Sequence, residues 1–196
     1  MCGYGIDYVA IMEAHTGAQS GLVQYLMGVL PDVWCARYLE MTDGVGNILE
    51  FEDGGFTFLF DFTSALGEDD VAEDRVVAAF GVTFRQASDR DASRIRGYPM
   101  SPPQGIDAHY DRGHFISHVA GGSLDVNLFP QTRAVNRGWS ETGKLFRKME
   151  RYAADRPGTF CFARPVYRDL SCCPAIVEYG VLMDEGALWV NSFPNV

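Results

Sequence analysis

Three short polar motifs between residues 111 and 139 contain side chains that can do chemistry. In chain order they are Asp111-Arg112-Gly113-His114, Asn127-Leu128-Phe129-Pro130-Gln131 and Asn136-Arg137-Gly138-Trp139. A neutral imidazole such as that of His114 accepts a proton near pH 7 and can activate water. The amide oxygen of Asn136 is a neutral ligand for a hard cation such as Mg²⁺, and the Arg112 guanidinium can contact a phosphate. Together these residue types favour metal-assisted hydrolysis of a phosphate ester.

Each of these residues also has a structural explanation. A histidine such as His114 can make a single structural hydrogen bond, and Arg112 can pair with Asp111 or Asp107. Asn136 can cap a helix or turn the chain, although a cap and a metal ligand are compatible. The presence of both downstream motifs favours catalysis for His114 and metal binding for Asn136. The two interpretations of Arg112 are evenly balanced, and we take it as the second catalytic residue, which offsets charge on the phosphoryl oxygens.

The three motifs, in this order, resemble the DNA/RNA non-specific endonucleases, whose active site is the ββα-metal (His-Me finger) motif. The resemblance covers about residues 105–183. It implies that His114 is the general base and Asn136 the ligand of Mg²⁺, for which Mn²⁺ can substitute. It also implies that Asn127 and Gln131 hold the site together and position metal-bound water. The implied substrate is DNA, with RNA as a second candidate, cleaved with little sequence preference.

One position departs from the pattern of that family. Many members carry a Glu eight residues after the metal-binding Asn, and that position here is Lys144. Another branch carries its Glu fourteen residues on, at Glu150. Fourteen residues of unbroken helix span about 21 Å, too far to share one metal, unless Gly143 breaks the helix. Glu141 is the other candidate. Both glutamates could instead simply belong to a solvent-exposed helix face. We favour Glu150 as the third catalytic residue.

Family members also carry an arginine upstream of the first motif that binds phosphate near the leaving group. The spacing does not select one residue, and the candidates are Arg85, Arg90, Arg94 and Arg96. We favour Arg96, against the alternative of a solvated loop charge. His118 stands four residues after His114, but no second ligand motif accompanies it, so we interpret it as structural.

The charge of the chain is unevenly distributed. The net charge is −10 over 196 residues and the sequence pI is near 4.7, which by itself argues against a polyanionic substrate. Residues 1–85, however, hold fourteen acidic residues against three arginines, a net charge of −11. Residues 86–196 hold twelve acidic residues against thirteen basic ones, eleven of them Arg, a net charge of +1. The motifs therefore lie in the half of the chain that does not repel nucleic acid.

The acidic half raises a second hypothesis from another class. Residues 1–85 could dock an Arg-rich partner or mimic a polyanion, with the rest of the chain an inactive nuclease scaffold. A third hypothesis combines the two, with a protein inhibitor or activating partner bound through the acidic portion, as in a toxin or defence effector. A cleavage assay with and without a chelator distinguishes an active nuclease from an inactive nuclease scaffold.

The predicted fold is α+β with a mostly antiparallel sheet, because strands outnumber helices and do not alternate with them regularly. We expect one nuclease domain over 1–196, with an acidic N-terminal portion (1–85) and a nuclease core (86–196). A helix over 16–30 is predicted to end at Pro31. Further predictions are a hairpin of 47–52 with 56–61, strands at 75–85, 114–119, 159–167 and 175–183, a helix within 140–154, and a long loop over 86–108.

The sequence shows no sign of a membrane or of export. No stretch of about eighteen uninterrupted apolar residues occurs, and no basic residue precedes Arg37, as a signal peptide would require. Five cysteines, with no paired C-x-x-C spacing, are typical of reduced thiols rather than of a zinc ribbon. The default expectation is a cytoplasmic protein without a membrane partner, compatible with delivery to another cell.

Overall fold

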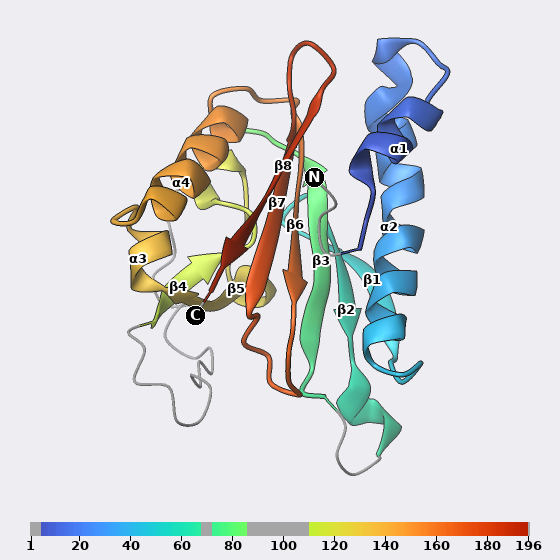
Figure 1. Cartoon of the computed structure of the whole chain (residues 1–196), viewed down its shortest axis with the longest axis vertical. Helices are drawn as coiled ribbons and strands as arrows, with labels where there is room; N and C mark the ends of the chain where they lie inside the picture. The colour runs from blue at the N-terminus through green and yellow to red at the C-terminus, as the bar shows by residue number, and fades with distance from the viewer. Residues whose placement is uncertain (1–4, 68–71, 86–109, 196) are drawn as a thin grey trace.

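The computed structural model describes residues 5–67, 72–85 and 110–195, and it is α+β with every described strand pair antiparallel, as predicted (Figure 1). A six-stranded sheet has the order β1-β2-β3-β6-β7-β8, and β4 and β5 form a second, two-stranded sheet. The helices are α1 (Tyr8–Ala14), α2 (Leu22–Met41), α3 (Arg133–Asn136) and α4 (Glu141–Ala154). The strands are β1 (Ile48–Asp53), β2 (Phe56–Asp61), β3 (Arg75–Val82), β4 (Tyr110–His114), β5 (Leu128–Thr132), β6 (Phe160–Val166), β7 (Ile176–Leu182) and β8 (Leu188–Pro194).

Helices α1 and α2 cover one face of the large sheet, and the β4-β5 pair with α3 and α4 covers the other (Figure 1). A separate hydrophobic core lies on each side. The first contains Leu26, Leu30 and Trp34 of α2 packed on Phe80 and Phe162. The second is built from α4, the β4-β5 module and the opposite sheet face, and its members include Phe115, Phe129, Phe146, Met149 and Tyr179. The module that contains the three motifs is therefore anchored on its own core.

The predicted hairpin of β1 and β2 is confirmed. Asp53 pairs with Phe56 across Gly54 and Gly55, both with positive φ, which the turn requires and glycine adopts without strain. Strand β3 then pairs with β6, with Ala79 opposite Ala163. The acidic N-terminal portion and the C-terminal portion thus contribute strands to one continuous sheet.

The prediction that a helix ends at Pro31 is wrong, because α2 continues through this proline to Met41. Pro31 removes one backbone donor and costs about 3 kcal/mol in a helix interior. Residues beyond it compensate: Trp34 and Tyr38 continue the four-residue spacing of Leu26 and Leu30, and all four are buried. Burial of each large apolar side chain contributes about 1.5–3 kcal/mol, so packing on the sheet exceeds the cost of the proline.

The predicted strand at 114–119 is also wrong in position, because β4 ends at His114 and a 3₁₀ turn follows at His118–Ala120. Asn127 explains this change of direction. Its Oδ1 accepts a hydrogen bond from the Ile116 N–H (2.8 Å), and its Nδ2 donates to the carbonyls of Ile116 (2.7 Å) and Ser123 (2.8 Å). The backbone after His114 therefore bonds to a buried amide instead of extending the strand.

The remaining predicted elements are mostly confirmed. The helix within 140–154 and the strands near 75–85, 159–167 and 175–183 correspond to α4, β3, β6 and β7, whereas α1, β5 and β8 were not predicted. The predicted loop over 86–108 lies outside the described residues. Within the part of the chain that the structure describes, no helix is both long and apolar enough to span a membrane.

Candidate active site

The β4-β5 pair and α3 bring the three sequence motifs together. Asp111 of the first motif lies opposite Gln131 of the second in the antiparallel register. Helix α3 begins directly after β5 and ends at Asn136, the first residue of the third motif. A strand pair followed at once by a helix thus places residues separated by up to 26 positions within contact distance.

Asp111 is the residue at which the first and third motifs meet. Its carboxylate accepts hydrogen bonds from Asn136 Nδ2 (3.4 Å), from Arg133 Nε (3.1 Å) and from Arg137 Nε and Nη2 (2.6 and 3.1 Å). These donors, the Arg137 guanidinium first among them, lower the pKa of Asp111 below its ordinary value. The carboxyl group therefore stays ionised at neutral pH and accepts from three side chains at once.

This arrangement fixes the orientation of the Asn136 amide. An ionised carboxylate only accepts hydrogen bonds, so the amide nitrogen must face Asp111. The amide oxygen, Oδ1, is consequently directed away from Asp111 and is the atom that a hard cation would bind. A single amide oxygen suits Mg²⁺, which keeps most of its water ligands, and among the described residues no group of three or more His, Cys, Asp or Glu forms a metal site.

Gly143 positions α3, and with it Asn136, against α4. A Cβ at Gly143 would come within 2.5 Å of the Ala134 carbonyl oxygen and 2.8 Å of that of Val135, so only glycine permits this approach. The expectation that Gly143 could break the helix is wrong: α4 is continuous, and the Gly143 N–H donates to Ser140 Oγ at the helix start (2.9 Å). The glycine serves close packing between helices instead of a break.

His114 and Arg112 occupy the end of β4. His114 is half-buried, and its strand neighbour is Leu128 of β5. Arg112 is exposed, and in the described residues it makes no ion pair. The alternative in which Arg112 pairs with Asp111 is wrong, because that carboxylate is bound to Arg133 and Arg137; Asp107 lies outside the described residues.

Gln131 and Gly113 show why the first motif needs a glycine. A Cβ at Gly113 would lie 2.5 Å from both Cβ and Oε1 of Gln131. The Gln131 side chain therefore occupies the space that a side chain at position 113 would need. It is buried, and its Oε1 has no hydrogen-bond partner among the described residues. An unpaired buried oxygen is unfavourable, which makes Gln131 a candidate for holding water in this site.

Glu150 lies in a second part of the module, an open cavity of about 530 Å³. Its lining residues are Arg85, Ser117, Val119, Arg147, Glu150, Arg151, Ala154 and Asp155. Burial of the carboxyl group raises the pKa of Glu150 to about 7, an effect that the nearby Arg147 opposes. Because α4 is unbroken, Glu150 lies about 10 Å along the helix axis from Gly143, where α4 meets α3. Glu141, the other candidate, pairs with Lys144 on the exposed first turn (2.6 Å).

One of the four upstream arginines lies at the same cavity. Arg85 is the upstream arginine that lines it among the described residues, together with Glu150, and Ser117, three residues after His114, lies between the cavity and the end of β4. Arg96, with Arg90 and Arg94, lies outside the described residues. The sequence offered Arg85 only as one of four candidates, because nothing in its local spacing indicates that the end of β3 approaches α4.

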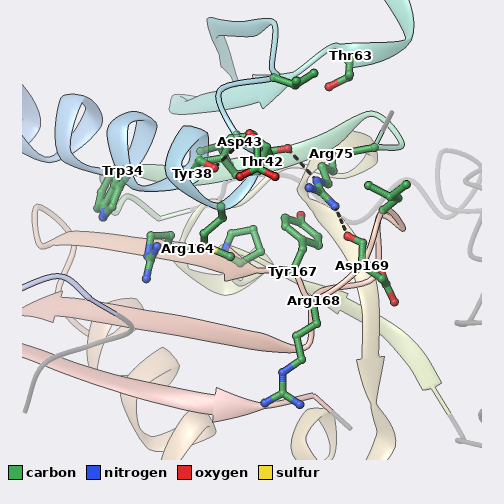
Figure 2. Close-up of a pocket in the computed structure, with 16 residues that line it drawn as sticks. Trp34, Tyr38, Thr42, Asp43, Thr63, Arg75, Arg164, Tyr167, Arg168 and Asp169 are labelled. Atoms are coloured by element: carbon green, nitrogen blue, oxygen red, sulfur yellow. Dashed lines mark hydrogen bonds between the residues drawn. The ribbon is translucent and has the colours of Figure 1, made fainter. Parts of the chain in front are cut away.

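A second cavity, of about 460 Å³, lies on the α2 side of the sheet, and none of the predicted site residues lines it (Figure 2). The buried Arg75 guanidinium is held at its wall, where Nε donates to the Tyr38 hydroxyl (2.8 Å) and Nη1 to the carbonyls of Asp169 (2.8 Å) and Ser171 (3.1 Å). Tyr38 in turn donates to Asp61 (2.6 Å). These contacts join α2 to β3 and to the segment after β6.

Comparisons with known proteins add little to this geometry. No family model matches the chain, and no curated protein matches it. Among solved structures, one described as "Structure of Sda1 nuclease with bound zinc ion" matches with 24% sequence identity and a TM-score of 0.38. The match covers 44% of this chain and 39% of that chain. It is a partial likeness, and the functional argument rests on the residues themselves.

Proposed function

We propose that this chain is a metal-dependent endonuclease that hydrolyses phosphodiester bonds of DNA, and of RNA as a second substrate, without sugar specificity. The observation that carries the proposal is the contact of Asp111 with Asn136. It unites the D-R-G-H and N-R-G motifs and turns the Asn136 amide oxygen outward, as a ββα-metal site needs. We infer that the whole chain, 1–196, acts as one nuclease unit, since β3 and β6 share a sheet.

His114 takes the proton from the water that attacks phosphorus, and the P–O3′ bond breaks to leave a 5′-phosphate and a 3′-hydroxyl. The exposed guanidinium of Arg112 donates to the phosphoryl oxygens as negative charge builds on them. Asn136 would hold Mg²⁺ or Mn²⁺ through Oδ1, and the bound ion supplies positive charge near the leaving oxygen.

The supporting residues act through position. Asn127 fixes the backbone after His114 by its three hydrogen bonds, and Gln131 holds water beside Gly113. Glu150 and Arg85 form the far end of the site, where Arg85 binds a neighbouring phosphate. Arg96 stays a second candidate for that contact.

A cleavage assay tests the proposal. The protein is incubated with plasmid DNA, single-stranded DNA and RNA in Mg²⁺, in Mn²⁺ and in EDTA. We expect cleavage in either metal, none in EDTA, and a loss of at least about 100-fold in His114→Ala. His118→Ala is the matched control and should keep activity, because among the described residues the His118 ring hydrogen-bonds to the Gly122 carbonyl alone. Cleavage by His114→Ala at the wild-type rate would overturn the mechanism.

A further inference from the structure

Trp139 is exposed beside the candidate site. Its side chain is 64% exposed, whereas Trp34 in the α2 core is fully buried. Indole is a large apolar group, and an exposed one in a polar motif contributes nothing to a core. Trp139 follows Asn136 by three residues and lies in the turn between α3 and α4. Its position and exposure suggest a surface that contacts a ligand.

The ring is held in place by the same network that orients Asn136. The backbone N–H of Trp139 donates to the Ala134 carbonyl (2.9 Å), which fixes the turn that carries the ring. The Arg137 guanidinium lies over the indole, 5.1 Å from its centroid. Arg137 is itself anchored to Asp111 through two N–H groups. One face of the ring is therefore covered by a positioned cation while most of the side chain remains open to solvent.

We propose that Trp139 is a base-stacking subsite of the nuclease, so that the enzyme binds an unpaired nucleotide next to the scissile phosphate. The proposal rests on the proposed function. Aromatic rings stack on nucleobases of any sequence, and each such contact contributes about 1–3 kcal/mol. Bases in a duplex are covered by their neighbours, so the subsite favours single-stranded or locally unstacked substrates.

The surroundings favour a nucleic acid over a peptide as the occupant. Arg137 lies over the ring, and Arg133 binds the same Asp111 carboxylate as Arg137. Their side chains are 47% and 35% exposed, so a strand whose base stacks on Trp139 has cations near its phosphates. The Asn136 amide, whose oxygen is the metal-binding atom of the proposal, is linked to the ring by three contacts, through Arg137 and Asp111. A bound nucleotide would therefore have an aromatic ring for its base and guanidinium groups for its phosphate.

Equilibrium binding in EDTA tests the subsite without cleavage. Fluorescence anisotropy with a labelled single-stranded DNA of about twelve nucleotides compares wild type, Trp139→Ala, Trp139→Phe and Leu170→Ala. We expect Trp139→Ala to bind about 5- to 100-fold more weakly, from the stacking energy above, and Trp139→Phe to recover most of the loss. Leu170, 52% exposed at the rim of the other cavity, is the matched exposed apolar control and should bind as wild type.

The decisive comparison repeats the binding measurement with a strand of the same length made of abasic nucleotides. It keeps every phosphate and lacks every base, so wild type and Trp139→Ala should bind it equally. Equal binding of the normal strand by both proteins would overturn the subsite, and so would an equal loss on both strands, which indicates a structural role. Either result leaves the metal-dependent cleavage assay, and with it the proposed function, to be judged separately.

Discussion

The two faces of the sheet each carry an arginine stacked on aromatic rings, and the two clusters differ in burial. Beneath α2, the guanidinium of Arg75 lies 4.2 Å from the Tyr167 ring centroid, and the residue is only 5% exposed (Figure 2). Beside α3, Arg137 lies over Trp139, and both side chains are largely exposed. The same pair of chemical groups occurs in both places, so residue type alone does not distinguish them.

The two clusters differ in the acceptors that the arginine N–H groups bind. Arg75 donates to one hydroxyl and two backbone carbonyls of the protein, which ties separate segments together. Arg137 donates to a single carboxylate that also orients Asn136, and it leaves an aromatic surface open. We infer that the enclosed cluster stabilises the fold, whereas the open cluster serves the site. The predictions below test this contrast.

The largest effect on stability should come from Arg75→Met. The substitution leaves the buried Tyr38 hydroxyl and the Asp169 and Ser171 carbonyls without their donor and should cost about 3 kcal/mol of unfolding free energy. Arg137→Met should leave stability near that of wild type and reduce cleavage instead. Urea unfolding and initial cleavage rates of both variants are the measurement. Equal destabilisation by the two would contradict the contrast.

A smaller effect is expected from Gly143→Ala, at the junction of α3 and α4. The added Cβ meets backbone oxygens at 2.5 and 2.8 Å, so the helices must separate at a cost of about 1–3 kcal/mol, and activity should fall because Asn136 moves. The matched control is Gly28→Ala in α2, where a Cβ meets nothing within 4 Å. That variant should be about 0.5–1 kcal/mol more stable than wild type, by thermal or urea unfolding.

Asp111→Asn tests the orientation of the metal ligand. An amide at this position both donates and accepts, so it no longer selects one orientation of the Asn136 amide, and Arg133 and Arg137 lose their charged partner. We expect the Mg²⁺ concentration for half-maximal cleavage to rise about 10-fold, while the rate at saturating metal falls less. A titration of cleavage rate against Mg²⁺ measures both; an unchanged half-maximal concentration would argue against the orienting role.

The smallest effect concerns Glu150, because its cavity is open to solvent. The folded-state pKa of about 7 exceeds the ordinary value, so the folded protein binds the proton more tightly than the unfolded chain. This contribution to stability is fully present below about pH 4.5, and it is lost as pH rises to about 7. Glu150→Gln does not titrate, so its urea midpoint relative to wild type should increase over that interval. A difference that stays constant with pH would contradict the shift.

Local signals predicted the elements that depend on neighbouring residues. The β1-β2 hairpin was predicted from two runs that flank Gly54 and Gly55, and the predicted helix within 140–154 is α4, which the local Ser140 cap begins. Elements decided by distant contacts were missed or misplaced. Helix α2 passes Pro31 because Trp34 and Tyr38 pack on the sheet, and β4 ends at His114 because Asn127, thirteen residues later, binds the following backbone.

By itself the sequence determined which residue types are available, because the three motifs place a histidine, two asparagines and two arginines within 30 residues. The tertiary structure alone decided how these groups are paired. Asp111 binds Arg133, Arg137 and Asn136 rather than its neighbour Arg112, and Arg85 reaches the cavity of Glu150 from the end of β3. Hydrogen-bond partners depend on distance in space, which strand register and helix packing set and which sequence separation does not reveal.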